Sequence, residues 1–260
     1  MIKRRAVLLS LAMPVLALAI AFLATPVLAT SMLPANSYGY DISYPDTSYP
    51  GTTFGGQTLK FGIVGVTGGK AFTQNSKLSA EYNSVVTVNH LAASFYMNLN
   101  YPVGTTASNG MTGPKGNCSN GDKACQAYNY GYNASANAFG YASTTIGAGA
   151  AASGPWWLDI ETANSWSGKT SLNDTVIQGG LDYFKGSNIA IGIYSSPSMW
   201  RSIAGSWAPG VPEWFAGPSG VDPSKLPGYC NTAANFTGGA VAVVQSYNSS
   251  FGHDLDYACQ

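Results

Sequence analysis

Short apolar segments rich in β-branched residues recur along most of the chain and alternate with polar or helix-prone segments. They are apolar almost throughout rather than at every second position, which is typical of parallel strands buried on both faces. We predict strands at Tyr40–Ser43, Leu59–Val66, Ala92–Tyr96, Trp156–Ile160, Ile189–Tyr194, Glu213–Ala216 and Ala240–Gln245. This pattern restricts the fold to an α/β arrangement around a parallel sheet.

Helix-prone segments lie between these predicted strands. We predict helices from Ser171 or Asn173 (either of which can cap the first turn) to Lys185, and over Asp122–Tyr141, Lys77–Val88 and Pro197–Ile203. Alternating strands and helices in a chain of this length fit a closed (β/α) barrel better than an open sheet. The sequence therefore predicts a single TIM-like barrel domain over residues 39–260, preceded by a short tether at residues 30–38.

The first 29 residues have the layout of a secretory signal peptide. A basic start precedes the apolar run Ala6–Leu23, and a small-x-small cleavage pattern follows at Val27–Ala29. An uncleaved membrane anchor is the alternative, because the run approaches the length of a spanning helix. Pro14 and Pro26 favour cleavage. We therefore expect a secreted protein, cleaved near Ala29, that is not stably inserted in a membrane.

The chain carries unusually little charge, and this excludes several classes of protein. Only 9% of its residues are charged, against about 25% in an average soluble protein. Cleavage would leave nine Lys and Arg against 12 acids, so a basic nucleic-acid binder is excluded. The 45% hydrophobic content excludes a disordered chain. No nucleotide-binding glycine motif or nucleophile elbow is present, and two histidines leave little material for a Ser-His-Asp hydrolase.

Four cysteines lie in the part that would remain after cleavage: Cys118, Cys125, Cys230 and Cys259. Export implies an oxidising environment, in which paired cysteines form disulfides. Of the three connectivities we predict the local one, Cys118–Cys125 and Cys230–Cys259. The chain has no C-x-x-C motif, so we expect neither a metal site nor a cofactor.

The few acidic residues concentrate at the ends of predicted strands. Asp41 ends the first strand, Asp159 and Glu161 end the fourth, and Asp254 and Asp256 follow the last. In a parallel barrel these ends converge on one mouth, where barrel enzymes keep their active sites. The acids therefore predict a site rich in carboxylates.

Asp159 and Glu161 have the spacing of a catalytic carboxylate pair. On a strand they point to the same side, about 6.6 Å apart along the backbone. Glycoside cleavage needs one protonated carboxyl and one ionised carboxylate, and this separation is compatible with either stereochemical outcome. The alternative is that these acids cap and begin the next helix.

Several short motifs occur in a fixed order along the chain. They are Tyr40-Asp41-Ile42-Ser43, Phe61-Gly62-Ile63-Val64, Trp157-Leu158-Asp159-Ile160-Glu161, Gly192-Ile193-Tyr194-Ser195, Trp214-Phe215-Ala216, Val244-Gln245-Ser246-Tyr247 and Gly252-His253-Asp254-Leu255-Asp256. The ordered set resembles glycoside hydrolase family 25, the muramidase lysozymes, from Tyr40 to Asp256. The resemblance implies a somewhat irregular β/α barrel that cleaves the bond between N-acetylmuramic acid and N-acetylglucosamine.

Carried over by position, the resemblance implies roles for the strand-end acids. Glu161 would be the general acid and Asp159 its partner, with Asp41 and Asp254 as flanking carboxylates of the cleft. The chain departs from the family pattern at Gly68, where the family has an acid, and at Met97, where it usually has a His. It also departs at Asp256, where the family has Asn, and the segment Tyr101–Cys125 is an extra loop by this alignment.

Aromatic and polar residues near these motifs are candidates for binding a sugar. We predict substrate contacts from Trp166, Tyr96, Tyr194, Trp214 and Gln245. Together these features predict a secreted glycoside hydrolase of muramidase type, acting as a monomer on peptidoglycan or another polysaccharide. The alternative is a non-catalytic barrel that binds cell wall or polysaccharide, which the departures at Gly68 and Met97 favour.

Overall fold

The computed structural model describes residues 33–259, apart from residues 45, 47, 232–234 and 249–252. Ser31–Gln260 form one compact unit. The predicted signal peptide lies outside the described residues. Leu33 is buried and the first strand starts at Ser37, within the segment predicted as a tether. Among the described helices, none combines the length and the apolar character needed to cross a membrane.

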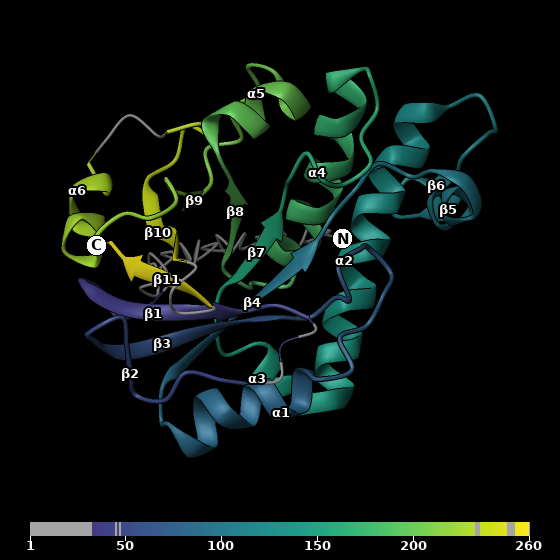
Figure 1. Ribbon diagram of the computed structural model, residues 1–260. Helices are drawn as coiled ribbons and strands as arrows, with labels where there is room; N and C mark the ends of the chain where they lie inside the picture. The colour runs from purple at the N-terminus through teal and green to yellow at the C-terminus, as the bar shows by residue number, and fades with distance from the viewer. Residues whose placement is uncertain (1–32, 45, 47, 232–234, 249–252, 260) are drawn as a thin grey trace, which may run out of the picture. The chain divides into compact units, whose positions relative to one another are not determined.

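Eight strands of the described chain close into a barrel (Figure 1). In order around the barrel they are β1 (Ser37–Ile42), β3 (Gln57–Gly65), β4 (Ala92–Asn98), β7 (Trp156–Asp159), β8 (Ile191–Ser195), β9 (Glu213–Ala216), β10 (Val241–Asn248) and β11 (His253–Ala258). Neighbours from β1 through β3 to β10 are parallel, and β11 is antiparallel to both β10 and β1. The predicted α/β barrel is therefore confirmed, and the reversed strand makes it irregular.

Strand β11 corrects one detail of the prediction. Asp254 and Asp256 were expected after the last strand, but both lie on β11, between β10 and β1. The segment alternates polar and apolar residues because one face places Asp254 at the polar barrel mouth and the other places Leu255 and Tyr257 in the outer core. It therefore lacks the continuous apolar run that identifies the other strands.

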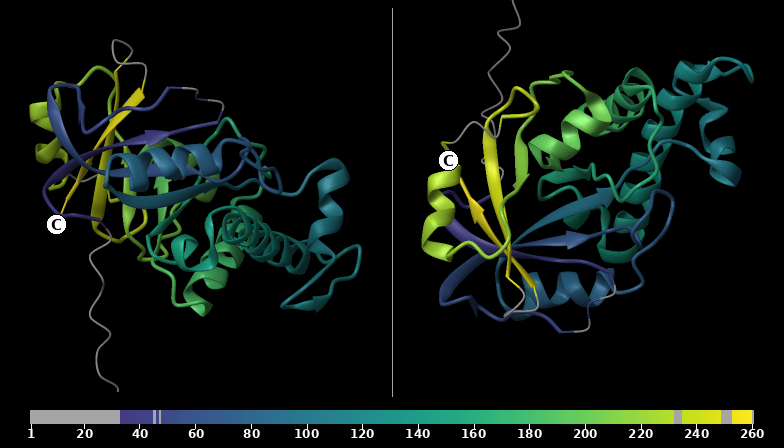
Figure 2. Two further views of the ribbon diagram at one scale, coloured as in Figure 1. Left: turned by 90° about the horizontal axis from the view of Figure 1, so that it is seen from below. Right: turned by 45° about the horizontal axis from the view of Figure 1, so that its top comes forward.

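Helices α2 (Lys123–Ile146) and α4 (Thr170–Gly186) pack together outside the barrel, as the views in Figure 2 show. Their backbones come very close at two glycines. A Cβ on Gly131 would lie 1.8 Å from the carbonyl oxygen of Val176, and one on Gly179 would lie 2.2 Å from that of Tyr128. Only glycine allows this approach between the two helix backbones. Helix α4 in turn contacts β7, the strand that ends at Asp159.

The remaining elements are short. They are α1 (Leu78–Tyr82), which continues as a π-helix (Asn83–Val88), α3 (Ala148–Ala151), α5 (Pro197–Ala204), α6 (Leu226–Tyr229), 3₁₀ turns at Gly104–Gly110 and Pro223–Lys225, and strands β2 (Thr53–Phe54), β5 (Thr112–Gly113) and β6 (Gly116–Asn117).

The helix boundaries differ from the predicted ones in two places. Asp122 caps α2, accepting a hydrogen bond from the Cys125 amide at 2.9 Å, but the helix continues beyond Tyr141 to Ile146. Helix α4 begins at Thr170, so neither predicted cap is its cap. Asn173 is instead buried inside the helix, and its amide donates to the carbonyl oxygen of Ile203 at 2.9 Å.

The barrel interior is filled with aromatic side chains below its mouth. Phe61, Trp157 and Trp214 pack there as one cluster with Tyr96 and Tyr194. The Trp214 ring lies 6.0 Å from that of Trp157 and 4.5 Å from that of Tyr194, measured between centroids. These rings form an apolar floor, so the polar groups above them are partly removed from water.

Both predicted disulfides are confirmed. Cys118–Cys125 joins the loop before α2 to its first turn, and Cys230–Cys259 joins the segment after α6 to the end of β11. Each should stabilise the fold by about 2–4 kcal/mol.

Candidate active site

Four carboxyl groups meet in one cavity at the mouth of the barrel. Asp41 comes from β1, Asp159 from the end of β7, Glu161 from two residues beyond it, and Asp254 from β11. The cavity measures about 170 Å³ and is lined by these four residues with Ser43, Tyr96, Tyr194, Trp214 and Gln245. Among the residues that the structure describes, no Lys or Arg lines it. The fold thus brings together every sequence-predicted site residue except Trp166.

Asp159 is buried and held by a chain of hydrogen bonds. Its carboxylate accepts a hydrogen bond from the amide of Asn98, the last residue of β4. The hydroxyl of Thr67 donates to the side-chain oxygen of Asn98 at 2.7 Å, which fixes the amide so that its NH₂ group points at Asp159. The other oxygen of Asp159 is buried and has no hydrogen-bond partner among the described residues.

Sequence reasoning missed Thr67 and Asn98. Both are polar residues at or directly after the ends of apolar strands, as the predicted acids are. A search for any polar side chain at a strand end, rather than for carboxylates alone, would have found them.

Glu161 is half-buried, and two hydrogen bonds hold its backbone in place. Its carbonyl oxygen accepts hydrogen bonds from the Asn164 amide at 3.1 Å and from the Trp166 indole at 2.7 Å. Trp166 therefore supports the Glu161 loop and does not line the cavity. Helix α4 starts at Thr170, well beyond Glu161, so the helix-cap interpretation of Asp159 and Glu161 is wrong.

On the opposite side of the cavity, Gln245 connects Asp41, Asp254 and Tyr194 through hydrogen bonds. Its amide donates to Asp41 at 2.8 Å and to Asp254 at 3.2 Å, and its side-chain oxygen accepts from the Tyr194 hydroxyl at 2.7 Å. Because the tyrosine hydroxyl occupies the oxygen, the amide NH₂ must face the two carboxylates.

Asp256 lies beneath this group and is fully buried. It accepts a hydrogen bond from the Trp214 indole at 2.8 Å and does not line the cavity. Burial and the nearby Asp41 carboxylate raise the pKa of Asp256 well above its usual value.

The two departures from the family motifs at Gly68 and Met97 have structural explanations. Tyr96 faces the cavity, so Met97, next to it on β4, points to the other side of the sheet and is buried in the outer core. A Cβ on Gly68 would lie only 3.0 Å from the carbonyl oxygen of Gln74, so this turn leaves little space for a side chain.

The carboxyl groups of the cavity hold their protons more tightly than exposed ones. Burial and the Asp254 carboxylate raise the pKa of Asp41 to about 8. Burial, with the charges of Asp46 and Glu161, raises the pKa of Asp254 to about 6. Burial also raises the pKa of Glu161, and burial with the Glu161 and Asp41 charges raises that of Asp159 well above its usual value. The cavity can thus supply protons near neutral pH.

Comparisons with known proteins agree with this architecture. The family model described as "Lysozyme-like protein 1" matches residues 125–229. A probable family 25 lysozyme of Dictyostelium discoideum is 43% identical over 70 residues, which are 25% of this chain and 32% of that protein. The match therefore spans about a third of that relative's length.

Solved structures extend the similarity in fold to most of the chain. A bacterial lysozyme from Streptomyces coelicolor superposes with a TM-score of 0.53 at 17% identity, covering 86% of this chain and 92% of that one. A family GH25 lysozyme from Aspergillus fumigatus gives a TM-score of 0.51 at 15% identity, covering 86% and 94%. The chain therefore resembles the lysozymes of glycoside hydrolase family 25, in sequence over part of its length and in fold over most of it, which confirms the resemblance predicted from its ordered motifs.

Proposed function

We propose that the protein is a secreted glycoside hydrolase that cleaves cell-wall glycan at the β-1,4 linkage between N-acetylmuramic acid and N-acetylglucosamine. The convergence of Asp41, Asp159, Glu161 and Asp254 on one cavity without a cation carries this proposal. Paired carboxyls in such a setting are the groups that glycoside cleavage needs. The lysozymes and muramidases among its relatives support the class of substrate.

The hydrogen bonds around the pair support Glu161 as the acid and Asp159 as its partner. Because the two charges repel, Asp159 and Glu161 retain one proton between them above the pH at which a free carboxyl ionises. Asn98 donates a hydrogen bond to Asp159, and this favours the ionised form of that residue. The Glu161 carboxyl accepts no hydrogen bond from the residues that the structure describes. Burial raises the pKa of Asp159 as well, but the hydrogen bond from Asn98 to Asp159, with none to the Glu161 carboxyl, supports placing the shared proton on Glu161 in the reacting enzyme.

The reaction follows from this assignment. Glu161 gives its proton to the glycosidic oxygen as the bond to the anomeric carbon breaks, and the leaving sugar departs as an alcohol. Asp159, as a carboxylate, stabilises the positive charge at the anomeric carbon. Water then adds to that carbon and returns a proton to Glu161. Asp41 and Asp254, joined through Gln245, line the other side of the cavity.

A direct assay tests the proposal. Reducing ends released from purified peptidoglycan should exceed those released from chitin and from cellulose by the same amount of enzyme. If the enzyme cleaved only chitin or only cellulose, it would still be a glycoside hydrolase, but the proposed substrate would be wrong. Binding to one of these glycans with no cleavage of any would establish the alternative, a polysaccharide-binding barrel.

The support given to Asp159 by Thr67 can be tested with Thr67→Val. This change removes the hydroxyl that fixes Asn98 and should lower the cleavage rate about 3–10-fold. A less well-held Asn98 stabilises the Asp159 charge less, so the acid limb of the pH–rate profile should move to higher pH. The control, Thr175→Val on the outer helix α4, should change neither. An unchanged profile in Thr67→Val would exclude this role.

Export can be tested by mass spectrometry. Secreted protein should begin at or near Thr30 and contain no free thiol, because its four cysteines form Cys118–Cys125 and Cys230–Cys259. Recovery of intact chain starting at Met1 in the membrane fraction would show instead that the N-terminal segment is an anchor.

A further inference from the structure

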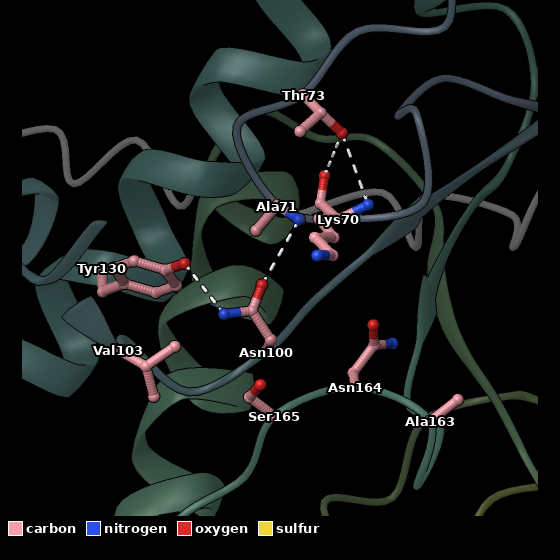
Figure 3. A pocket seen from close by; sticks show the side chains of 9 residues that line it. All are labelled: Lys70, Ala71, Thr73, Asn100, Val103, Tyr130, Ala163, Asn164 and Ser165. Carbon is pink, nitrogen blue, oxygen red and sulfur yellow. Dashed lines mark hydrogen bonds between the residues drawn. The ribbon is translucent and has the colours of Figure 1, made fainter. Parts of the chain in front are cut away.

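A second cavity is formed by loops at the mouth of the barrel, and Figure 3 shows the side chains that line it. It measures about 310 Å³, within the range of small-molecule sites. The loops that follow β3, β4 and β7 form it, together with one side chain of α2. Its lining residues are Lys70, Ala71, Thr73, Asn100, Val103, Tyr130, Ala163, Asn164 and Ser165.

This cavity is built on the same loops as the catalytic pair. The backbone amide of Asn164 donates a hydrogen bond to the carbonyl oxygen of Glu161 at 3.1 Å, so a single tight turn joins the proposed acid to the cavity wall. On β4, Asn98 contacts Asp159, and Asn100 lines the cavity two residues later. A glycan bound across Glu161 would therefore extend over this cavity.

The walls of the cavity are preorganised. The Asn100 side chain accepts a hydrogen bond from the Ala71 amide at 3.3 Å and donates to the carbonyl of Tyr101 at 2.8 Å and the hydroxyl of Tyr130 at 3.0 Å (Figure 3). The Thr73 hydroxyl donates to the carbonyl of Lys70 at 2.6 Å. These bonds hold the backbone that carries Lys70.

The side chains of Lys70, Asn164 and Ser165 form no hydrogen bond or ion pair with the residues that the structure describes. Among the residues that the structure describes, Lys70 is the only charged one that lines the cavity, and its ammonium group forms no ion pair with any of them. The side-chain amide of Asn164 likewise makes no hydrogen bond within the described part of the chain. Both can donate hydrogen bonds, so together they suit an anion.

We propose that Lys70 and Asn164 form a subsite for a carboxylate carried by the glycan, and that Lys70 determines the preference for an acidic substrate. The inference rests on the proposed function. A substrate carboxylate is repelled by the carboxylates of the catalytic cavity and attracted by Lys70, so it enters the second cavity and sets the position of the chain over Glu161. The carboxylate can belong to the lactyl group of a muramic acid or to a uronic acid.

The test compares wild type, Lys70→Met and a matched control, Lys185→Met, which removes the same charge from the exposed end of α4. The first probe is a tetrasaccharide of alternating N-acetylglucosamine and N-acetylmuramic acid, and the second is its methyl ester. The third is the neutral N-acetylglucosamine tetramer. A hyaluronan tetrasaccharide supplies uronic acid and distinguishes the two sources of the carboxylate.

Lys70→Met should raise KM for the free acid about 10-fold, with kcat, the ester and the neutral tetramer almost unaffected. Asn164→Ala should act in the same direction, and Lys185→Met should match wild type. If Lys70→Met raised KM equally for the acid and its ester, or left KM for the acid unchanged, the subsite would be wrong while the proposed function stands. If wild type cleaves none of the probes, the proposed function fails. Calorimetry then decides the subsite, because only a loss of affinity specific to the free acids supports it.

Discussion

Glu161→Gln should reduce the cleavage of peptidoglycan at least about 100-fold. The glutamine keeps the size of the side chain but has no proton to give to the leaving oxygen, and general acid catalysis contributes about 10²–10⁴-fold. Glycan affinity and the melting temperature should barely change, because Glu161 is half-buried at the cavity and its carboxyl holds no other described residue in place. The rate should be measured as reducing ends released, and affinity by calorimetry.

Glu81→Gln is the matched control for this variant. Glu81 is buried in α1 and accepts a hydrogen bond from Asn75 at 2.7 Å, away from the catalytic cavity. The same chemical change there should leave the rate as in wild type. Asp159→Asn should reduce the rate heavily, and Asp41→Asn or Asp254→Asn less. A Glu161→Gln protein that cleaves as fast as wild type would contradict the proposed mechanism.

The pH dependence of the wild-type rate bears on the same residue. Burial raises the pKa of Glu161, so the carboxyl stays protonated to higher pH than an exposed glutamate. The rate should therefore be highest at acidic pH and fall as Glu161 ionises. In the Glu161→Gln variant this descending limb should be absent from the residual activity.

The barrel could be predicted because its parallel strands are covered on both faces. Strands such as β7, with all four residues buried, need a continuous apolar sequence, and that signal is visible without a structure. Strand β11 carries Asp254 and Asp256 on one face and gives no such signal. Its pairing with both β10 and β1 depends on contacts between distant parts of the chain, which local patterns do not contain.

The convergence of the acids could be predicted from topology, but their hydrogen-bond partners could not. Asp41, Asp159 and Glu161 follow from strand ends that meet at one mouth. The link from Thr67 through Asn98 to Asp159 depends on side-chain directions across two loops. Trp166 was placed in the cleft because it follows Glu161 closely, yet its indole turns inward to bind the Glu161 carbonyl. Proximity in sequence does not determine the direction of a loop side chain.

Lowering the pH from 8 to 4 should stabilise the folded protein. The pKa of Asp254 is raised to about 6 and that of Asp41 to about 8, whereas the same groups in the unfolded chain ionise near 3.9. At pH values between the unfolded and the folded pKa, the folded state binds more protons than the unfolded state, so the free energy of unfolding falls as the pH rises. The contribution is fully present below about pH 4 and is lost as the pH passes the folded pKa values.

The expected difference is at least about 2 kcal/mol, which corresponds to about 4–8 °C in the melting temperature. Calorimetric melts between pH 4 and pH 8 measure it. Asp41→Asn should flatten the dependence and raise the melting temperature at pH 8, because the amide never has to carry a buried charge. Asp222→Asn is the control: Asp222 is exposed, and hydrogen bonds from Ser224 lower its pKa, so its removal should leave the slope between pH 4 and pH 8 unchanged. A melting temperature that rises from pH 4 to pH 8 would contradict this prediction, because it would require the carboxyls at the barrel mouth to be ionised and paired with cations in the folded protein. No Lys or Arg among the described residues lines the cavity to form such pairs.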